Sequence, residues 1–334
     1  MSESSRYRLD WSQVNLRGGL KTVLVIVLAA VVLILFGGLG ITVGLAALFV
    51  IFGDGPGSLR SRLFNVASFT AVGSALAFAG AWAGTDHLVL GSFLVAVVVF
   101  LATMAAALGK SAAVRGLLLA VWVVLALALS GSVDTPASLS LAFAVGGFLA
   151  GAALWLYGLI RPGEFSEVDR QPLIATLFAQ LRVPRGEFAV IRGIATGLAT
   201  YVGALLFPDF PIWAVIAVLV ILQEERAATF QIGVLRMSGT LLGVVFGSAV
   251  LLVVGGNELA VIVAFLASGF GMIALQKVNY GVFTLFLTAM LVLALHVTGD
   301  DAIYGGVSRL FATLVGAAIA FAAILITTRR RLDV

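Results

Sequence analysis

A succession of long apolar segments, separated by short polar turns, limits what this chain can fold into. Crossing the hydrocarbon core of a bilayer as a helix takes about 20 apolar residues. The sequence is 61% hydrophobic and only 11% charged, whereas a soluble domain carries about 25% charged residues. The pattern therefore predicts an all-α polytopic membrane protein, embedded in a lipid bilayer, with twelve transmembrane helices. The expected spans are 20–36, 39–53, 63–83, 88–108, 113–130, 138–160, 190–207, 211–223, 229–254, 258–276, 280–297 and 303–327.

Lysines and arginines lie on one side of the predicted spans, and this bias sets the orientation of the chain. If the N-terminus is inside, 19 of the 20 basic residues fall at or near the inner ends of the spans. The outer loops carry carboxylates instead, and Arg309 departs from the pattern. We therefore expect a multi-pass protein of the cytoplasmic (inner) membrane with both termini cytoplasmic. The same distribution explains the net charge of +4 without a nucleic-acid partner.

Several functional classes are excluded by residues that the sequence lacks. The chain has no cysteine, so it contains neither disulfides nor thiolate metal sites. Its two histidines, His87 and His296, are far apart in the sequence, and we expect no bound metal ion. The sequence contains no phosphate-binding loop, and no nucleophile with a histidine and an acid at usable spacing. It therefore predicts neither a cofactor nor an enzymatic activity.

The two halves of the chain resemble each other when one is shifted by 170 residues. Thr70 and Gly73 then fall on Thr240 and Gly243, and we expect these small residues to pack helices in both halves. Six spans per half is an even number, so the copies face the same way, as in parallel-repeat transporters. The predicted domains are a cytoplasmic N-terminal segment (1–19), two parallel six-helix repeats (20–160 and 189–327), a cytoplasmic linker (161–188) and a basic cytoplasmic tail (328–334).

The linker contains a short apolar stretch, 172–181, between charged ends. This stretch is too short to span a bilayer, and an amphipathic helix lying on the cytoplasmic membrane surface is the expected structure. A partly ordered loop is the alternative.

The second span of each half is shorter than a bilayer requires. Residues 39–53 and 211–223 are both too short to cross the hydrocarbon core as straight helices. Short spans at matching positions of two halves point to the substrate site of a transporter. Each short span is followed by an acidic residue, Asp54 or Glu224, and then by a helix with small residues. We therefore expect these helix pairs to line the substrate pathway.

One arginine and a run of small residues distinguish the span 229–254. The small residues recur at helical spacing and form a flat stripe on which another helix can pack closely, at Gly239, Thr240, Gly243 and Gly247. Arg236 lies one turn before this stripe, inside an apolar run, where a charge is costly without a partner. It can offer a planar, fixed positive charge to a carboxylate substrate. The alternatives are contact with inner headgroups or an ion pair with the preceding acidic turn.

These residues resemble a known family. Trp213 in an apolar span, an acidic turn, the motif R-x-x-G-T-x-x-G that starts at Arg236, and the later pair Asn279-Tyr280 are similar to the fusaric acid resistance protein-like (FUSC) family. That family includes aromatic acid exporters, and the plant aluminium-activated malate transporters are similar to it. The resemblance covers roughly 192–325 and implies a secondary transporter that exports organic, aromatic carboxylate anions by using the proton motive force. A passive organic-anion channel and a non-transporting membrane scaffold or envelope-assembly factor are the alternatives.

The chain departs from the larger exporters of this family in one respect. Those proteins carry sizeable cytosolic domains after each membrane half, whereas the linker and tail here are short. A place in a multi-component, envelope-spanning pump is therefore not expected. We expect the chain to act alone or as a homodimer, with a small organic anion as its substrate.

The resemblance and the charge pattern together assign roles to nine side chains. The expected substrate-binding residues are Arg236, Lys277, Asn279, Tyr280, Trp213 and Arg309, and the candidates for proton coupling are Glu224, Glu225 and Asp54. A carboxylate in a partly dry site has a raised pKa, which suits it to proton uptake and release. Glu224 and Glu225 can instead fix their turn by an ion pair with an arginine. Asp54 lies between two glycines, as turn residues do.

The other assigned residues also have structural interpretations. Arg309 can pair with the nearby outer carboxylates or reach the outer headgroups. Trp213 lies where aromatic residues border the membrane in any case. Lys277 is typical of an inner loop, and Asn279 can cap the helix that follows it.

Overall fold

The computed structural model describes residues 9–20, 23, 27, 38–55, 57–84, 87–132, 135–160, 185–254, 257–297 and 301–332. Within these residues the secondary structure consists of eleven α-helices with defined bounds and three short 3-10 helices, with no strand. Seven of these α-helices are long and apolar enough to cross a membrane. The prediction of an all-α membrane protein is therefore confirmed. The first expected span, 20–36, lies largely outside the described residues, so the count of twelve stays a prediction.

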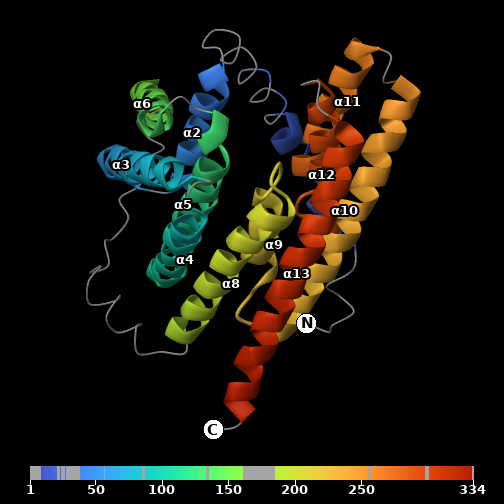
Figure 1. The fold of residues 1–334 in the computed structure, drawn as a ribbon. Helices are drawn as coiled ribbons and strands as arrows, with labels where there is room; N and C mark the ends of the chain where they lie inside the picture. The colour runs from blue at the N-terminus through green and yellow to red at the C-terminus, as the bar shows by residue number, and fades with distance from the viewer. Residues whose placement is uncertain are drawn as a thin grey trace. The chain divides into compact units, whose positions relative to one another are not determined.

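The helices pack as two units, which Figure 1 shows as ribbons. Unit 2, residues 29–206, contains α2 (Gly38–Gly53), α3 (Leu59–Ala83), α4 (Leu88–Ala105), α5 (Lys110–Ala128), α6 (Pro136–Ile160) and α8 (Arg185–Leu206). Unit 1, residues 1–28 and 207–334, contains a 3-10 helix (Trp11–Gln13), α9 (Ile212–Ile221), α10 (Arg226–Val254), α11 (Glu258–Ala274), α12 (Tyr280–Val297) and α13 (Ala302–Leu332). These bounds lie close to the predicted spans. The predicted amphipathic helix over 172–181 lies outside the described residues.

Local side-chain signals set several helix ends. The hydroxyl of Ser58 accepts the N–H of Ser61 at the start of α3, at 3.3 Å. The side chain of Asn257 accepts the N–H of Ala260 at the start of α11, at 3.1 Å. Both bonds satisfy a backbone donor that the helix itself leaves without a partner. Helix α3 ends at Gly84, whose φ of 41° is a conformation that other residues adopt only with strain.

Unit 2 is built around an aromatic core. Helix α3 packs on α5 and α6, and α2 packs on α6. The ring of Trp122 in α5 lies 4.5 Å from that of Phe143 in α6 and 5.6 Å from that of Phe49 in α2, measured between centroids. Trp122 and Phe143 are fully buried. Inside a bilayer such close packing, more than exclusion of water, holds helices together.

In unit 1, α10 and α12 approach each other closely along the glycine stripe. A Cβ atom at Gly239 or Gly243 would meet the backbone carbonyl oxygen of Gly281 or Leu285, and Gly247 continues this contact. Backbone atoms cannot move aside as the end of a flexible side chain can. The stripe therefore has to consist of glycine for these two helices to pack as they do. Helix α13 packs beside α9 and α10 in the same unit (Figure 1).

Unit 2 contains α8, the first helix of the second predicted half, and unit 1 contains residues 9–20 from the start of the chain. In unit 2, α8 packs on α4, with Gly193 against Ala96. In unit 1, the N-terminal segment (residues 9–20) lies against α11, where the N–H of Asn15 donates to the carbonyl oxygen of Ala274 at 2.8 Å. The packing units therefore differ in their boundaries from the predicted repeats, since α8 belongs to unit 2 and residues 9–20 belong to unit 1.

Candidate functional site

Arg236 in α10 is buried and bonded to a side chain of α12. It is only 2% exposed, and its Nη1 donates to the hydroxyl oxygen of Tyr280 at 2.8 Å. Its Nε is buried and has no hydrogen-bond partner among the described residues. Tyr280 is positioned as the first residue of α12, where the side chain of Asn279 accepts the N–H of Gly281 at 2.7 Å. Arg236 therefore keeps part of its hydrogen-bonding capacity unused inside the helix bundle.

Arg309 in α13 is buried against Trp213 of α9, a helix of 10 residues that lies within the short segment predicted over 211–223. Arg309 is 2% exposed, and its guanidinium carbon lies 3.9 Å from the centroid of a Trp213 ring. A cation over an indole is attracted by about 2 kcal/mol when the pair is desolvated. All three guanidinium nitrogens are buried without a hydrogen-bond partner in the described part of the chain. The guanidinium group of Arg309 therefore has unused hydrogen-bond donors inside the helix bundle.

We group the two arginines as one candidate site. Arg309 lies on α13, which packs on both α10, the helix of Arg236, and α12, the helix that begins at Tyr280. Neither arginine forms an ion pair with a carboxylate among the residues that the structure describes. We call Arg236, Arg309, Trp213 and Tyr280 the twin-arginine site. Because burying a charge without a counter-charge is strongly unfavourable, a site with two such charges is suited to bind an anion.

The structure corrects the expected surroundings of Arg309. The sequence places this residue on the outer side, near carboxylates or headgroups, and Arg236 near the inner end of its helix. In the structure Arg309 is buried and does not extend to the surface. The carboxylate of Asp301 instead caps α13 by accepting the N–H groups of Ile303 at 3.0 Å and Tyr304 at 2.9 Å. Both arginine side chains are buried on helices that pack against each other, α10 and α13.

Buried threonines follow the site residues on the same three helices. They lie at intervals of one turn from Arg236, Tyr280 and Arg309, as Thr240, Thr284, Thr288 and Thr313. The Oγ1 atoms of Thr240 and Thr288 are buried without a hydrogen-bond partner in the described residues. Our sequence analysis assigned Thr240 to packing and did not single out the other three. The signal that could have identified them is their spacing: Thr284 and Thr313 lie four residues after Tyr280 and Arg309, and Thr288 lies eight residues after Tyr280.

The acidic turn lies at the surface of unit 1. Glu224 and Glu225 are exposed between α9 and α10. Thr229 fixes this turn, because its hydroxyl accepts the N–H of Gln223 at 3.0 Å and donates to the carbonyl oxygen of the same residue at 3.1 Å. Lys277 is likewise exposed, in the turn between α11 and α12. These charged side chains are therefore accessible at helix ends rather than buried with the twin-arginine site.

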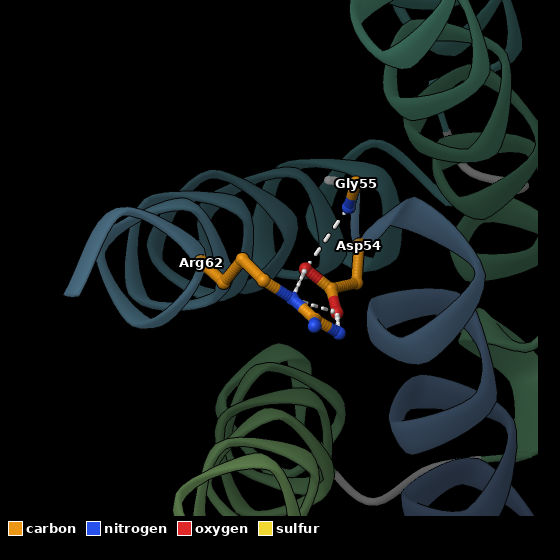
Figure 2. Close-up of polar contacts among 3 residues, drawn as sticks. All are labelled: Asp54, Gly55 and Arg62. Atoms are coloured by element: carbon orange, nitrogen blue, oxygen red, sulfur yellow. Dashed lines mark hydrogen bonds and ion pairs between the residues drawn. The ribbon is translucent and has the colours of Figure 1, made fainter. Parts of the chain in front are cut away.

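Asp54 forms an ion pair within unit 2 (Figure 2). Its carboxylate pairs with Nη2 of Arg62 and accepts from Nε of the same residue at 2.9 Å. It also accepts the N–H of Gly55 at 2.9 Å. These bonds connect the end of α2 to the first turns of α3. They favour the interpretation of Asp54 as a turn residue, and its role in proton coupling stays a prediction.

The variant Asp54→Asn is expected to lower the free energy of unfolding by about 1–3 kcal/mol, because Arg62 would lose the charged acceptor of a part-buried bond. Its dependence of transport on pH is expected to match that of the wild type. Thermal unfolding in detergent and flux across a range of pH values measure the two effects. Glu225→Gln, a change at an exposed carboxylate, is the control for stability. A shifted pH profile in Asp54→Asn would instead identify Asp54 as a coupling residue.

Comparison with known proteins identifies the segment that contains this site. Residues 194–323 match the fusaric acid resistance protein-like family, and this range includes all four residues of the twin-arginine site. The chain is also 33% identical over 134 residues to an uncharacterized protein of Synechocystis sp.. That alignment covers 39% of this chain and only 18% of the relative, so the match spans a small part of that protein's length. No solved structure matches the chain. Over residues 194–323, the chain is therefore similar to the fusaric acid resistance protein-like family.

Proposed function

We propose that this protein is a secondary transporter that exports organic, aromatic carboxylate anions across the cytoplasmic membrane. The observation that carries the proposal is the twin-arginine site, where two positive charges are buried without a counter-charge in the described residues. A guanidinium with unused donors can bind a carboxylate through two parallel hydrogen bonds. A membrane protein that resembles this family and has such a site is consistent with anion transport.

The proposed ligand is held by charge and by aromatic surface together. Its carboxylate bonds to Arg309, whose three nitrogens have no partner in the described residues. Arg236, oriented by its bond to Tyr280, supplies the second positive charge. The half-buried rings of Trp213 and Tyr280 offer apolar surface to an aromatic ligand. The exposed Lys277, in the turn that Asn279 ends, attracts anions toward the inner end of the path.

We also propose that the chain has twelve spans in two parallel six-helix repeats. At a shift of 170 residues, Gly146 of α6 corresponds to Gly316 of α13. A Cβ atom at Gly146 would meet the backbone of α2 at Val43, and one at Gly316 would meet the backbone of α9 at Ala214. Helix α3 packs on α5 and α6 just as α10 packs on α12 and α13. These matching contacts support an internal duplication.

Within this duplication, anions bind only in the second half of the chain, which contains Arg236 and Arg309. The positions that correspond to Arg236 and Arg309 are Val66 and Leu139. Both are buried and belong to the apolar core of unit 2 around Trp122. An anion has no charged partner there, so the first half acts as a structural copy and each chain has one twin-arginine site.

In this proposal the proton motive force provides the free energy for anion export. Glu224 and Glu225 follow the short helix α9, which also carries Trp213 of the site. Because both carboxylates are exposed, they can exchange protons directly with the cytoplasm. A passive channel would need no such coupling group.

Flux of labelled benzoate, phthalate and succinate in proteoliposomes, with and without a pH gradient, tests the function. We expect gradient-dependent flux of the aromatic anions in the wild type and a loss of about 30-fold or more in Arg236→Ala, because leaving a buried charge unpaired costs about 2–5 kcal/mol. Arg226→Ala removes an exposed arginine from the same helix and is expected to retain flux.

The other outcomes separate the alternatives. Flux that ignores the pH gradient and is accompanied by electrical conductance would indicate a passive organic-anion channel. Absence of flux for all three anions in the wild type would favour a membrane scaffold or envelope-assembly factor. Equal flux in Arg236→Ala and in the wild type would show that anions do not pass through the twin-arginine site.

A further inference from the structure

The twin-arginine site has no counter-charge among the residues that the structure describes. Arg236 and Arg309 are each 2% exposed, and neither pairs with a carboxylate in the part of unit 1 that the structure describes. The buried hydroxyls of Thr240 and Thr288 have no partners in the described residues, but they are neutral. The described residues therefore supply no charge that balances the two guanidinium groups, and a bound anion would supply it.

The free-energy cost of excluding water from the site differs between the empty state and the anion-bound state. With an anion bound, each guanidinium keeps a charged partner as the surroundings become dry. Without an anion, closure strips water from two like charges, and both the desolvation and their mutual repulsion grow as the local dielectric falls. A carrier has to seal its site from one side before it opens to the other. The empty twin-arginine site is thus poorly suited to this step.

We infer that this protein is an obligatory anion exchanger, in which the twin-arginine site reorients with an anion bound and does not reorient when empty. The inference rests on the proposed transport function. It also restricts the role of the proton motive force, which biases the direction of exchange instead of returning an empty site. The returning ligand is a second small anion that two guanidinium groups can bind, whether organic or inorganic.

Trans-stimulation of efflux tests this inference on the full chain. Proteoliposomes loaded with labelled phthalate are diluted into potassium HEPES medium with or without unlabelled phthalate. Valinomycin is present in both media, so that the membrane potential does not limit efflux. We expect efflux to be about tenfold faster or more when phthalate is outside, which corresponds to a barrier lower by about 1.4 kcal/mol.

A carboxylate introduced into the site by mutation is expected to let the site reorient without a bound anion. Thr240 lies one turn from Arg236 on α10, so Thr240→Asp supplies a fixed negative charge near the guanidinium groups. The ratio of efflux with external phthalate to efflux without it is expected to fall toward one in Thr240→Asp. The matched neutral variant Thr240→Asn is expected to keep the wild-type ratio.

The possible results distinguish the exchange inference from the transport proposal. Equal wild-type efflux into the two media would overturn obligatory exchange and leave transport itself intact. Absence of wild-type efflux in both media, together with inactivity toward benzoate and succinate, would overturn the transport proposal and the inference with it. If Thr240→Asp fails to fold, the wild-type ratio still decides between exchange and net transport.

Discussion

Replacing Arg309 with leucine is expected to stabilise the protein and to abolish anion flux at the same time. Exchange of a buried ion for an apolar side chain of similar volume is often stabilising, by about 1–4 kcal/mol. Loss of the contact with Trp213, about 2 kcal/mol for a desolvated pair, offsets part of this gain. Leucine is also the residue at the corresponding position of the proposed first repeat, where Leu139 is fully buried. We expect a melting temperature a few degrees above that of the wild type, with flux reduced about 30-fold or more.

Thermal unfolding of the purified protein in detergent, together with flux in proteoliposomes, measures both effects. Arg226→Leu is the matched control, because it makes the same change at an exposed arginine and is expected to alter neither property. Added phthalate should raise the melting temperature of the wild type but not that of Arg309→Leu, since a ligand stabilises only the form that binds it. A melting temperature below that of the wild type would show that Arg309 is not an uncompensated charge.

Gly243→Leu is expected to prevent the packing of α10 on α12. Even a single Cβ atom at this position would meet the carbonyl oxygen of Leu285 and the Cβ of Thr288, and backbone cannot yield by a rotamer change. Overpacking of a core costs about 1–3 kcal/mol, and more when backbone has to move. We therefore expect Gly243→Ala to lower the melting temperature by several degrees and Gly243→Leu to yield no monodisperse protein. Size-exclusion profiles and thermal unfolding in detergent measure these results.

Gly151 provides the control for this experiment. It also lies in a long apolar helix, but a Cβ atom there would make an ordinary contact with Val66, at 3.4 Å. Because alanine favours a helix by about 1 kcal/mol over glycine, Gly151→Ala is expected to keep or raise the melting temperature. A similar loss of stability in Gly243→Ala and Gly151→Ala would show that the close approach of α10 and α12 is not the reason why position 243 requires glycine.

The helices of this protein could be predicted from the sequence because hydropathy and turn residues act locally. Long apolar runs end at polar turns, and caps such as Ser58 and Asn257 lie next to the helices that they begin. The short α9 could be recognised for the same reason, since both of its ends are marked in the sequence. Local patterns of this kind depend on neighbouring residues and not on how helices are arranged.

The site could be predicted only in part, because its residues meet through packing. The sequence identifies Arg236, Tyr280 and Trp213 through a family motif, and Arg309 through its exception to the charge pattern. It does not reveal that Arg309 lies on Trp213 in a helix that packs on α10, because this depends on how the helices are rotated and placed. The charge pattern even suggests that the two arginines lie on opposite sides of the membrane.

The packing of α8 on α4 and of the N-terminal segment on α11 has a consequence for how the chain is assembled during synthesis. When the ribosome has made α8, all the helices described for unit 2 have emerged and can associate. Asn15, by contrast, can form its backbone hydrogen bond only after Ala274, whose carbonyl oxygen accepts that bond, has been synthesised. The N-terminal segment is therefore among the first parts of the chain to leave the ribosome, and it is among the last to make its contacts, because these are with α11. During synthesis, the N-terminal segment is thus made long before α11, the helix on which it packs.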